Sequence, residues 1–426
     1  MKLAWLNPVY WIYRLLRGLQ PGPVTPEQGR LLWLVGVALL IEAYDVQIYG
    51  LATPQIQAGL NIPEADIGRV VAIFRLGVIP ALALAYFADV FGRRTMLLIT
   101  AAGATVSTIA TAFTQDMTQF VAVQTLARVF SYAEVMLCFV IVAEEFEETT
   151  RGWATSVIGA LGALGAGTAA LMFALVNLLP FGWRALFLLG AIPLAWLLWA
   201  RRRLPETSRF TQHKLSAAYV GPLRSLLRSY PLRLIAMIAI TAPFAFATAP
   251  AVVLISKYLQ STHHWAPWQV TSLFLIGGTA SLAGTIVTGA LSDRLGRRLA
   301  LTLAIAAAAG GLASLYTWAT GYWLMALWIL IIYGELTTGI MIGGLTAELF
   351  PTSHRALAAG VRYLCAILAG ALGFIVEGEL FEYFGNHPEA IAAMLIATPF
   401  ALIPIWFLPE PAKKSLDEIA PEQFAG

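Results

Sequence analysis

The chain has 426 residues, of which 59% are hydrophobic and only 12% are charged, and its mean hydropathy is +0.74. A soluble globular protein carries roughly 25% charged residues, so this chain has too few polar side chains to cover a surface that faces water. The composition therefore excludes a soluble protein and predicts a membrane protein. The net charge of +3 gives no reason to expect nucleic acid as a partner, because the basic residues cluster in particular loops.

The first 30 residues precede any run long enough to cross a membrane. The opening MKLAWLNPVYWIYRLLRGLQ is apolar, but Arg14 and Arg17 interrupt it and no small-residue cleavage site follows. This pattern is unlike a cleaved signal peptide. We expect a cytoplasmic segment that contains an interfacial helix.

Long apolar runs occupy most of the remaining chain. A membrane-spanning helix needs about 20 apolar residues, and twelve segments meet that requirement. They predict an all-α membrane protein with twelve transmembrane helices. The expected spans are 31–57, 68–88, 95–113, 118–144, 152–179, 183–200, 233–257, 267–291, 299–319, 322–349, 356–383 and 389–408.

One long polar connection, rich in Arg, Ser and Pro, divides these spans six and six. The predicted domains are the amino-terminal segment 1–30, a six-helix bundle at 31–200, a cytoplasmic linker at 201–232, a second six-helix bundle at 233–408 and a cytoplasmic tail at 409–426.

Lysine and arginine are concentrated in the loops on one side of the twelve predicted spans. Loops rich in these residues stay in the cytoplasm. An even number of spans places both termini on that same side. We therefore expect both termini to be cytoplasmic and the protein to be multi-pass, in a bacterial cytoplasmic (inner) membrane.

The two sets of six spans repeat one another. The segment ADVFGRR, with Asp89, has a counterpart SDRLGRR, with Asp293, and the offset is 293 − 89 = 204. The same offset relates Glu144 to Glu348 and Arg151 to Arg355. Repeats of this kind indicate two pseudo-symmetric six-helix bundles in parallel orientation, an architecture found in transporters.

These repeated motifs resemble those of the major facilitator superfamily. The loops LAYFADVFGRR and GALSDRLGRR, and the segments AEEFEETTRG and AELFPTSHRALAAG, are similar to the family's paired loop signatures. RRRLPETSRF and FLPEPAKKSLDEI resemble the closing signatures of its sugar-porter and organic-ion branches, and EAYDVQIYG resembles the metabolite–proton symporter branch. The resemblance covers about residues 30–420. It implies a central cavity lined by spans one, four, seven and ten.

The loop motifs supply candidate gating residues. Each motif has an acid and an arginine four residues apart, with a glycine between them that permits a tight turn. We expect this charged cluster to latch the two bundles together at the cytoplasmic side. A simple topology anchor is the alternative interpretation. The candidates are Asp89, Gly92, Arg93, Glu144, Arg151, Asp293, Gly296, Arg297, Glu348 and Arg355.

Several charged residues fall inside the predicted spans, where an ionised group costs roughly 2.5–3.5 kcal/mol. With a rise of about 1.5 Å per residue, three acid–base pairs have matching depths. They are Asp45 with Arg75, Glu42 with Arg128, and Glu335 with Arg362. Each pair is either a structural salt bridge or a switch in which the acid takes a proton and frees the arginine for an anion.

We expect Asp45 and Glu42 to couple transport to protons and Glu335–Arg362 to be a structural or gating pair. The expected substrate-binding residues are two arginines, with polar and aromatic side chains of the cavity-lining spans: Arg128, Arg75, Tyr44, Gln47, Gln124, Tyr132 and Tyr333.

The sequence therefore predicts a secondary active transporter, not an enzyme, that moves a small organic anion such as a carboxylate metabolite by proton-coupled symport and alternating access. A proton-coupled sugar transporter, an efflux pump for drugs or metabolites, and a non-transporting membrane sensor are the alternatives. We predict no catalytic residues, no metal site and no cofactor. The expected partners are a small anionic substrate, protons and membrane lipid, with the protein acting as a monomer.

Overall fold

The computed structural model describes residues 24–201, 220–411 and 416–419, and this part of the chain is helical without a β-strand. The amino-terminal half contains α2 (Pro26–Leu51), α3 (Thr53–Leu60), α4 (Asp66–Arg75), α5 (Val78–Phe91), α6 (Arg93–Thr111), α7 (Met117–Glu145), α8 (Glu148–Phe173) and α9 (Trp183–Arg201). The carboxyl-terminal half contains α11 (Val220–Ser229), α12 (Pro231–Val253), α13 (Ile255–Ser261), α14 (Pro267–Leu295), α15 (Arg297–Thr317), α16 (Tyr322–Leu349), α17 (Thr352–Phe384), α18 (His387–Met394), η2 (Leu395–Ala397), α19 (Thr398–Leu402), η3 (Pro404–Phe407) and α20 (Leu416–Ile419).

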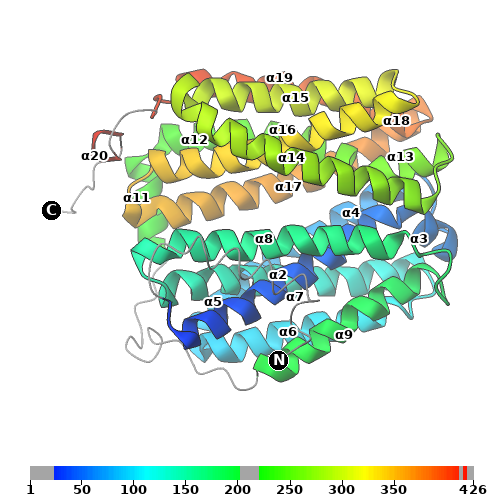
Figure 1. Ribbon diagram of the computed structural model, residues 1–426, viewed down its shortest axis with the longest axis horizontal. Coiled ribbons are helices and arrows are strands. Elements are labelled where there is room, and N and C mark those ends of the chain that lie inside the picture. Colours follow the sequence, from blue (N-terminus) through cyan, green and yellow to red (C-terminus); the bar gives the residue numbers. More distant parts are fainter. Residues whose placement is uncertain (1–23, 202–219, 412–415, 420–426) are drawn as a thin grey trace, which may run out of the picture.

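Ten helical segments of the described chain are long and apolar enough to cross a membrane. Helices α6 and α14 run alongside them and complete two sets of six (Figure 1). Figure 1 shows the amino-terminal set in the lower part of the view and the carboxyl-terminal set in the upper part. The predicted all-α fold of two six-helix bundles is confirmed.

Three predicted spans are interrupted helices. The second span consists of α4 and α5, which meet at Leu76 and Gly77, and the seventh consists of α12 and α13, which meet at Leu254. The last span divides into α18, η2, α19 and η3, and Pro399 and Pro404 occupy the starts of the later pieces. Proline lacks the backbone N–H that would continue a helix, so the breaks within the last span follow from its sequence.

The helices that carry Asp45 and Arg128 begin at side-chain caps. At α2, the hydroxyl of Thr25 accepts a hydrogen bond from the backbone N–H of Gln28, whose own side chain accepts from the N–H of Thr25. At α7, the carboxylate of Asp116 accepts from the N–H of Gln119. Such caps satisfy backbone donors that have no partner within the helix and fix where each helix starts.

The two ends of the molecule differ. The arginine-rich end contains the turns at Gly92 and Gly296, while the opposite end contains the turn at 61–65 and helix α13. Between the halves, α4 packs against α17, α8 against α14, and α13 against α2 and α3. The predicted interfacial helix falls mostly in residues 1–23, and much of the predicted linker and tail in 202–219, 412–415 and 420–426, all outside the described residues.

Candidate functional site

Asp45 of α2 and Arg128 of α7 form an ion pair inside the membrane-spanning part of the amino-terminal half. Arg128 Nη2 lies 3.5 Å from Asp45 Oδ2 and also 3.5 Å from the carbonyl oxygen of Asp45. Both side chains are almost completely buried, and neither carboxylate oxygen of Asp45 has a hydrogen-bond partner within the described residues. The guanidinium also lies 5.8 Å from the ring centre of Phe74. The pair is therefore long, and its carboxylate is incompletely satisfied.

This arrangement corrects the predicted pairing, in which Arg128 faced Glu42 and Asp45 faced Arg75. Depth along a helix gives the height of a side chain but not its direction around the helix axis, and the rotation of α2 turns Asp45 towards α7. Within the described residues, Glu42 and Arg75 form no ion pair.

Arg75, at the end of α4, reaches across to the other half of the molecule. Its guanidinium carbon lies 4.9 Å from the ring centre of Phe374 in α17. A Cβ atom built on Gly370, one turn earlier in α17, would lie only 2.8 Å from Arg75 Nη1. Tyr132 and Tyr363 lie near enough to interact with it electrostatically. An arginine between the two halves, over an aromatic ring and without a carboxylate partner in the described part of the chain, is suited to hold an anionic group.

The predicted pair Glu335–Arg362 is not formed. Across the described residues, no ion pair joins them, and Glu335 Oε1 and Arg362 Nε each lack a hydrogen-bond partner. The matching depths again did not predict which way the side chains point.

Three of the five polar residues predicted to contact substrate form hydrogen bonds within their own half, and their role stays a prediction. The Tyr44 hydroxyl donates to the carbonyl oxygen of Leu186 at 2.9 Å, and Gln124 Nε2 donates to Thr111 Oγ1 at 3.0 Å. The Tyr333 hydroxyl lies 2.6 Å from Thr288 Oγ1. Gln47 and Tyr132 have no hydrogen bond among the described residues, and Tyr132 lies near Arg75.

A second ion pair is buried between α7 and α9. Arg201 Nη1 lies 2.5 Å from Glu134 Oε1, and Arg201 Nη2 donates to the carbonyl oxygen of Leu34 at 3.2 Å. Arg201 is completely buried. Its partners all belong to the amino-terminal half, so this pair stabilises one bundle.

At the arginine-rich end, the two halves repeat one arrangement. Gly92 and Gly296 have φ angles of 98° and 97°, a region that favours glycine. After each glycine an arginine binds a glutamate of the fourth or tenth span: Arg93 binds Glu144 at 3.0 Å, and Arg297 binds Glu348 at 3.2 Å. The offset of 204 is thus confirmed in three dimensions.

The candidate latch residues at this end are joined within the halves in the contacts that the structure records. In the carboxyl-terminal half, Glu410 accepts hydrogen bonds from the backbone N–H groups of Arg297 and Arg298, so the start of α15 is capped by a residue beyond the last span. The side chains of Asp89, Arg151 and Asp293 are outside the described part, and Arg355 Nε lacks a hydrogen-bond partner there. The latching role remains a prediction.

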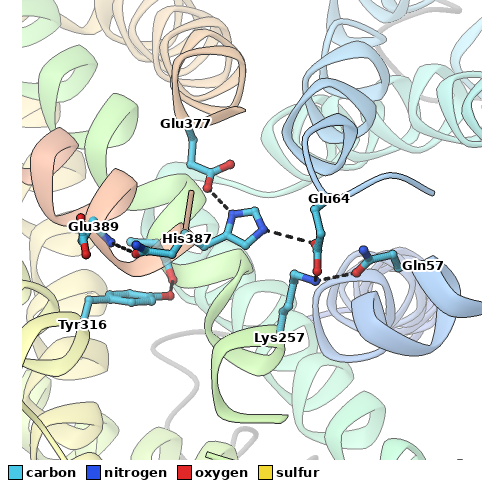
Figure 2. A network of polar contacts seen from close by, with 9 residues as sticks. Gln57, Glu64, Lys257, Tyr316, Glu377, His387 and Glu389 are labelled. Atoms are coloured by element: carbon cyan, nitrogen blue, oxygen red, sulfur yellow. Dashed lines mark hydrogen bonds and ion pairs between the residues drawn. The ribbon is translucent and has the colours of Figure 1, made fainter. Parts of the chain in front are cut away.

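Polar contacts between the halves gather at the opposite end (Figure 2). Lys257 of α13 binds Glu64 at 2.7 Å and Gln57 at 2.5 Å, both in the amino-terminal half. His387 of α18 joins Glu64 to the buried Glu377. Hydrogen bonding from His387, followed by the contacts with Lys257, lowers the pKa of Glu64 to about 2. Our sequence-based prediction did not single out Lys257 or His387, because each stands at a helix end without a motif.

Comparison with known proteins agrees with this architecture. A family model described as Major Facilitator Superfamily matches residues 35–347. The chain is 25% identical to a "Probable 4-methylmuconolactone transporter" of Cupriavidus pinatubonensis, over 93% of this chain and 94% of that protein. It is also 25% identical to a "Gallate transporter" of Pseudomonas putida, over 84% of this chain and 87% of that one.

Among solved structures, a D-xylose-proton symporter superposes with a TM-score of 0.74, covering 91% of this chain and 99% of that chain at 18% identity. At that identity the likeness concerns the fold alone. The family match spans most of the chain, and the relatives are transporters rather than enzymes, as the sequence predicts. The chain therefore belongs to the major facilitator superfamily.

Proposed function

We propose that this protein moves a small organic anion of the carboxylate type across the membrane by alternating access, coupled to protons. The observation that carries the proposal is the position of Arg75, between the halves and over Phe374, with no carboxylate partner among the described residues. A cation at that depth costs free energy unless a counter-charge is supplied, and a substrate carboxylate supplies one. The aromatic ring adds a flat apolar surface for the rest of the substrate.

Proton coupling is supported by Asp45. Its carboxylate is buried, is 3.5 Å from Arg128 and accepts no hydrogen bond from the described residues. A proton on Asp45 would remove its attraction for Arg128, which would then be available to an anion. In this scheme the proton and the substrate bind in one connected site, Asp45 gives the energetic link, and Arg128 and Arg75 hold the anion.

The relatives give a starting set of compounds. They are named as transporters of 4-methylmuconolactone and of gallate, so aromatic and related acids come first in the search. Purified protein in proteoliposomes would be tested for uptake of these acids and of other carboxylates, with xylose as the sugar control, under an imposed pH gradient. We expect acid uptake that follows the pH gradient. Uptake driven by sodium and indifferent to pH would refute the proton coupling.

Arg75→Ala tests the anion site, with Arg30→Ala, an exposed arginine of α2 far from Phe374, as the matched control. Truncating Arg75 should abolish saturable acid uptake while leaving the fold intact, and the Arg30 variant should behave as wild type. Normal affinity in the Arg75 variant, or uptake of xylose in preference to the acids, would refute an anion-binding role.

We further place both termini in the cytoplasm and the protein in a bacterial inner membrane, because the lysine- and arginine-rich loops lie at one end. The structure would then be closed at the periplasmic end. Alkaline phosphatase, which is active only in the periplasm, should be active when fused after Thr320 and inactive at the carboxyl terminus; the reverse pattern would overturn the orientation.

A further inference from the structure

One of the contacts that join the halves at the opposite end is made by an imidazole. His387 begins α18 and lies between two carboxylates: Nδ1 is 2.6 Å from Glu377 Oε1 in α17, and Nε2 is 3.4 Å from Glu64 Oε2 in the turn before α4. Figure 2 shows the ring between these two groups. Glu64 belongs to the amino-terminal half and the other two residues to the carboxyl-terminal half, so the ring links the halves.

Both ring nitrogens lie within hydrogen-bond distance of a carboxylate oxygen. An ionised carboxylate only accepts hydrogen bonds, whereas a neutral imidazole has one donor and one acceptor nitrogen. Only the imidazolium form donates to both carboxylates at once. If the ring lost its proton, one of the two carboxylates would face a lone pair, and Glu377 is completely buried.

The other groups around His387 do not replace that proton. Lys257 of α13 is already bound to Glu64 and Gln57. Tyr316 of α15 donates to the carbonyl oxygen of Ala251, and Tyr258 of α13 donates to the carbonyl oxygen of Leu315. The ring of Phe381, stacked at 4.4 Å, offers no charge. On α18 itself, the backbone N–H of Glu389 donates to Asn386 Oδ1. The Glu389 side chain has no contact with the ring in the described structure.

Protons reach this cluster from the solvent at the opposite end. A cavity of about 280 Å³ is lined by Glu64, Lys257 and His387, among others. The side chain of Glu64 is 48% exposed, while that of His387 is 12% exposed. The pKa of Glu64, about 2, keeps this carboxylate ionised at any pH near neutrality. Histidine is the side chain that ordinarily changes charge between pH 5 and 8, and here its ring lies between the two acids.

We propose that His387 is a proton-binding latch. When its ring takes a proton from the solvent at the opposite end, it holds Glu64 and Glu377 together and keeps that end shut. Loss of the proton frees Glu64 and favours the state open at this end. The proton arrives from and returns to the same solvent, so it is separate from the one carried with substrate. The latch thus sets how the transport cycle responds to the pH of the solvent at the opposite end. This inference rests on the alternating-access cycle, and not on the substrate's identity or on proton coupling.

The test follows the separation of the halves in full-length protein without substrate. Spin labels would be attached to cysteines placed at Gln115 and Thr320, both exposed at the opposite end, with Cys138→Ser and Cys365→Ser to remove the native thiols. Double electron–electron resonance would give the distance distribution at each pH from about 5 to about 9, the range in which histidine titrates. We expect the short distance at low pH and a growing long-distance population as pH rises. One linked proton changes the open-to-closed ratio by up to about tenfold per pH unit.

Three variants complete the experiment. His387→Gln should abolish the pH response, while His263→Gln, a histidine of the loop beside α13 at the same end, should keep it. Glu377→Gln, which retains an acceptor without the charge, should move the midpoint to lower pH, and it tests the latch if the His387 variant fails to fold.

A wild-type distribution that does not change with pH, or an unaltered response in His387→Gln, would overturn the latch whatever the acid-uptake assay shows. Failure of acid uptake with an intact pH response would refute only the proposed substrate.

Discussion

Gly68 lies where α4 meets α17, at the contact that closes the opposite end, and its substitution by alanine tests how that end is held. A Cβ atom at Gly68 would lie 2.3 Å from the carbonyl oxygen of Phe374 and 3.2 Å from Glu377 Oε2. The nearer atom belongs to the backbone, so a change of side-chain rotamer gives no relief. Ordinary van der Waals contact begins near 3.4 Å, so the two helices must separate by about 1 Å.

The free-energy cost falls on one conformation only. Overpacking of this kind costs about 1–3 kcal/mol, and it applies only while α4 and α17 are in contact. If this contact opens in the transport cycle, the whole cost shifts the equilibrium between the two states. An energy of that size corresponds to about 5–150-fold in favour of the state open at the opposite end.

The spin-label pair at Gln115 and Thr320 measures this shift directly, and thermal unfolding checks the fold. Gly167→Ala is the matched control, because a Cβ there meets nothing within 4 Å. We expect the Gly68 variant to gain long-distance population and the Gly167 variant to match wild type. A folded Gly68 variant with an unchanged distance distribution would show that this helix contact persists throughout the cycle, and the reasoning would be refuted.

Three other predictions follow from charges already described. Asp45→Asn should abolish uphill accumulation of substrate but retain exchange, as measured by pH-driven uptake and counterflow; unimpaired accumulation would make Asp45 structural. Glu64→Gln should lower the melting temperature at about pH 5, because the pKa of Glu64 is lowered from 4.5 to about 2 and its ionised form stabilises the fold above both values. That difference should shrink as pH falls below about 4.5, and a difference that grows there would contradict the assignment. Glu134→Ala should cost about 3–5 kcal/mol in thermal unfolding, since it leaves Arg201 buried and unpaired, while Glu134→Leu combined with Arg201→Met should recover much of the loss; an undisturbed melting temperature in Glu134→Ala would show that Arg201 finds another partner.

The fold was accessible from the sequence because its signals are local and repeated. Apolar runs of fixed length predict the spans, and the offset of 204 predicts that Arg93–Glu144 and Arg297–Glu348 are equivalent pairs, which the structure confirms. The breaks within spans were less predictable. Pro399 and Pro404 stand at their breaks, and Pro80 stands four residues after Leu76, so the Leu76 carbonyl has no α-helical donor. The break at Leu254 has no such proline.

The intramembrane site was predicted only in part. Asp45 and Arg128 were both expected inside the spans, but spacing along a helix gives only the height of a side chain, so Arg128 was assigned to Glu42 instead of Asp45. Polar groups such as those of Tyr44 and Gln124 found partners on neighbouring helices, which no spacing within one helix reveals. Lys257 and His387 come from distant segments, and only the folded chain brings them to Glu64.

The distribution of charged contacts has a consequence for how the cycle is driven. At the arginine-rich end, the recorded pairs Arg93–Glu144 and Arg297–Glu348 lie within single halves, so they can persist when the halves move apart or together. At the opposite end, Lys257, His387 and Glu64 bond across the halves, and these bonds must break for that end to open. Charge pairs of this kind stabilise one state and not the other, and only such differential contacts bias a conformational equilibrium. The contacts at the opposite end, where Glu64 meets both a lysine and a histidine of the other half, therefore supply energetic control of this kind.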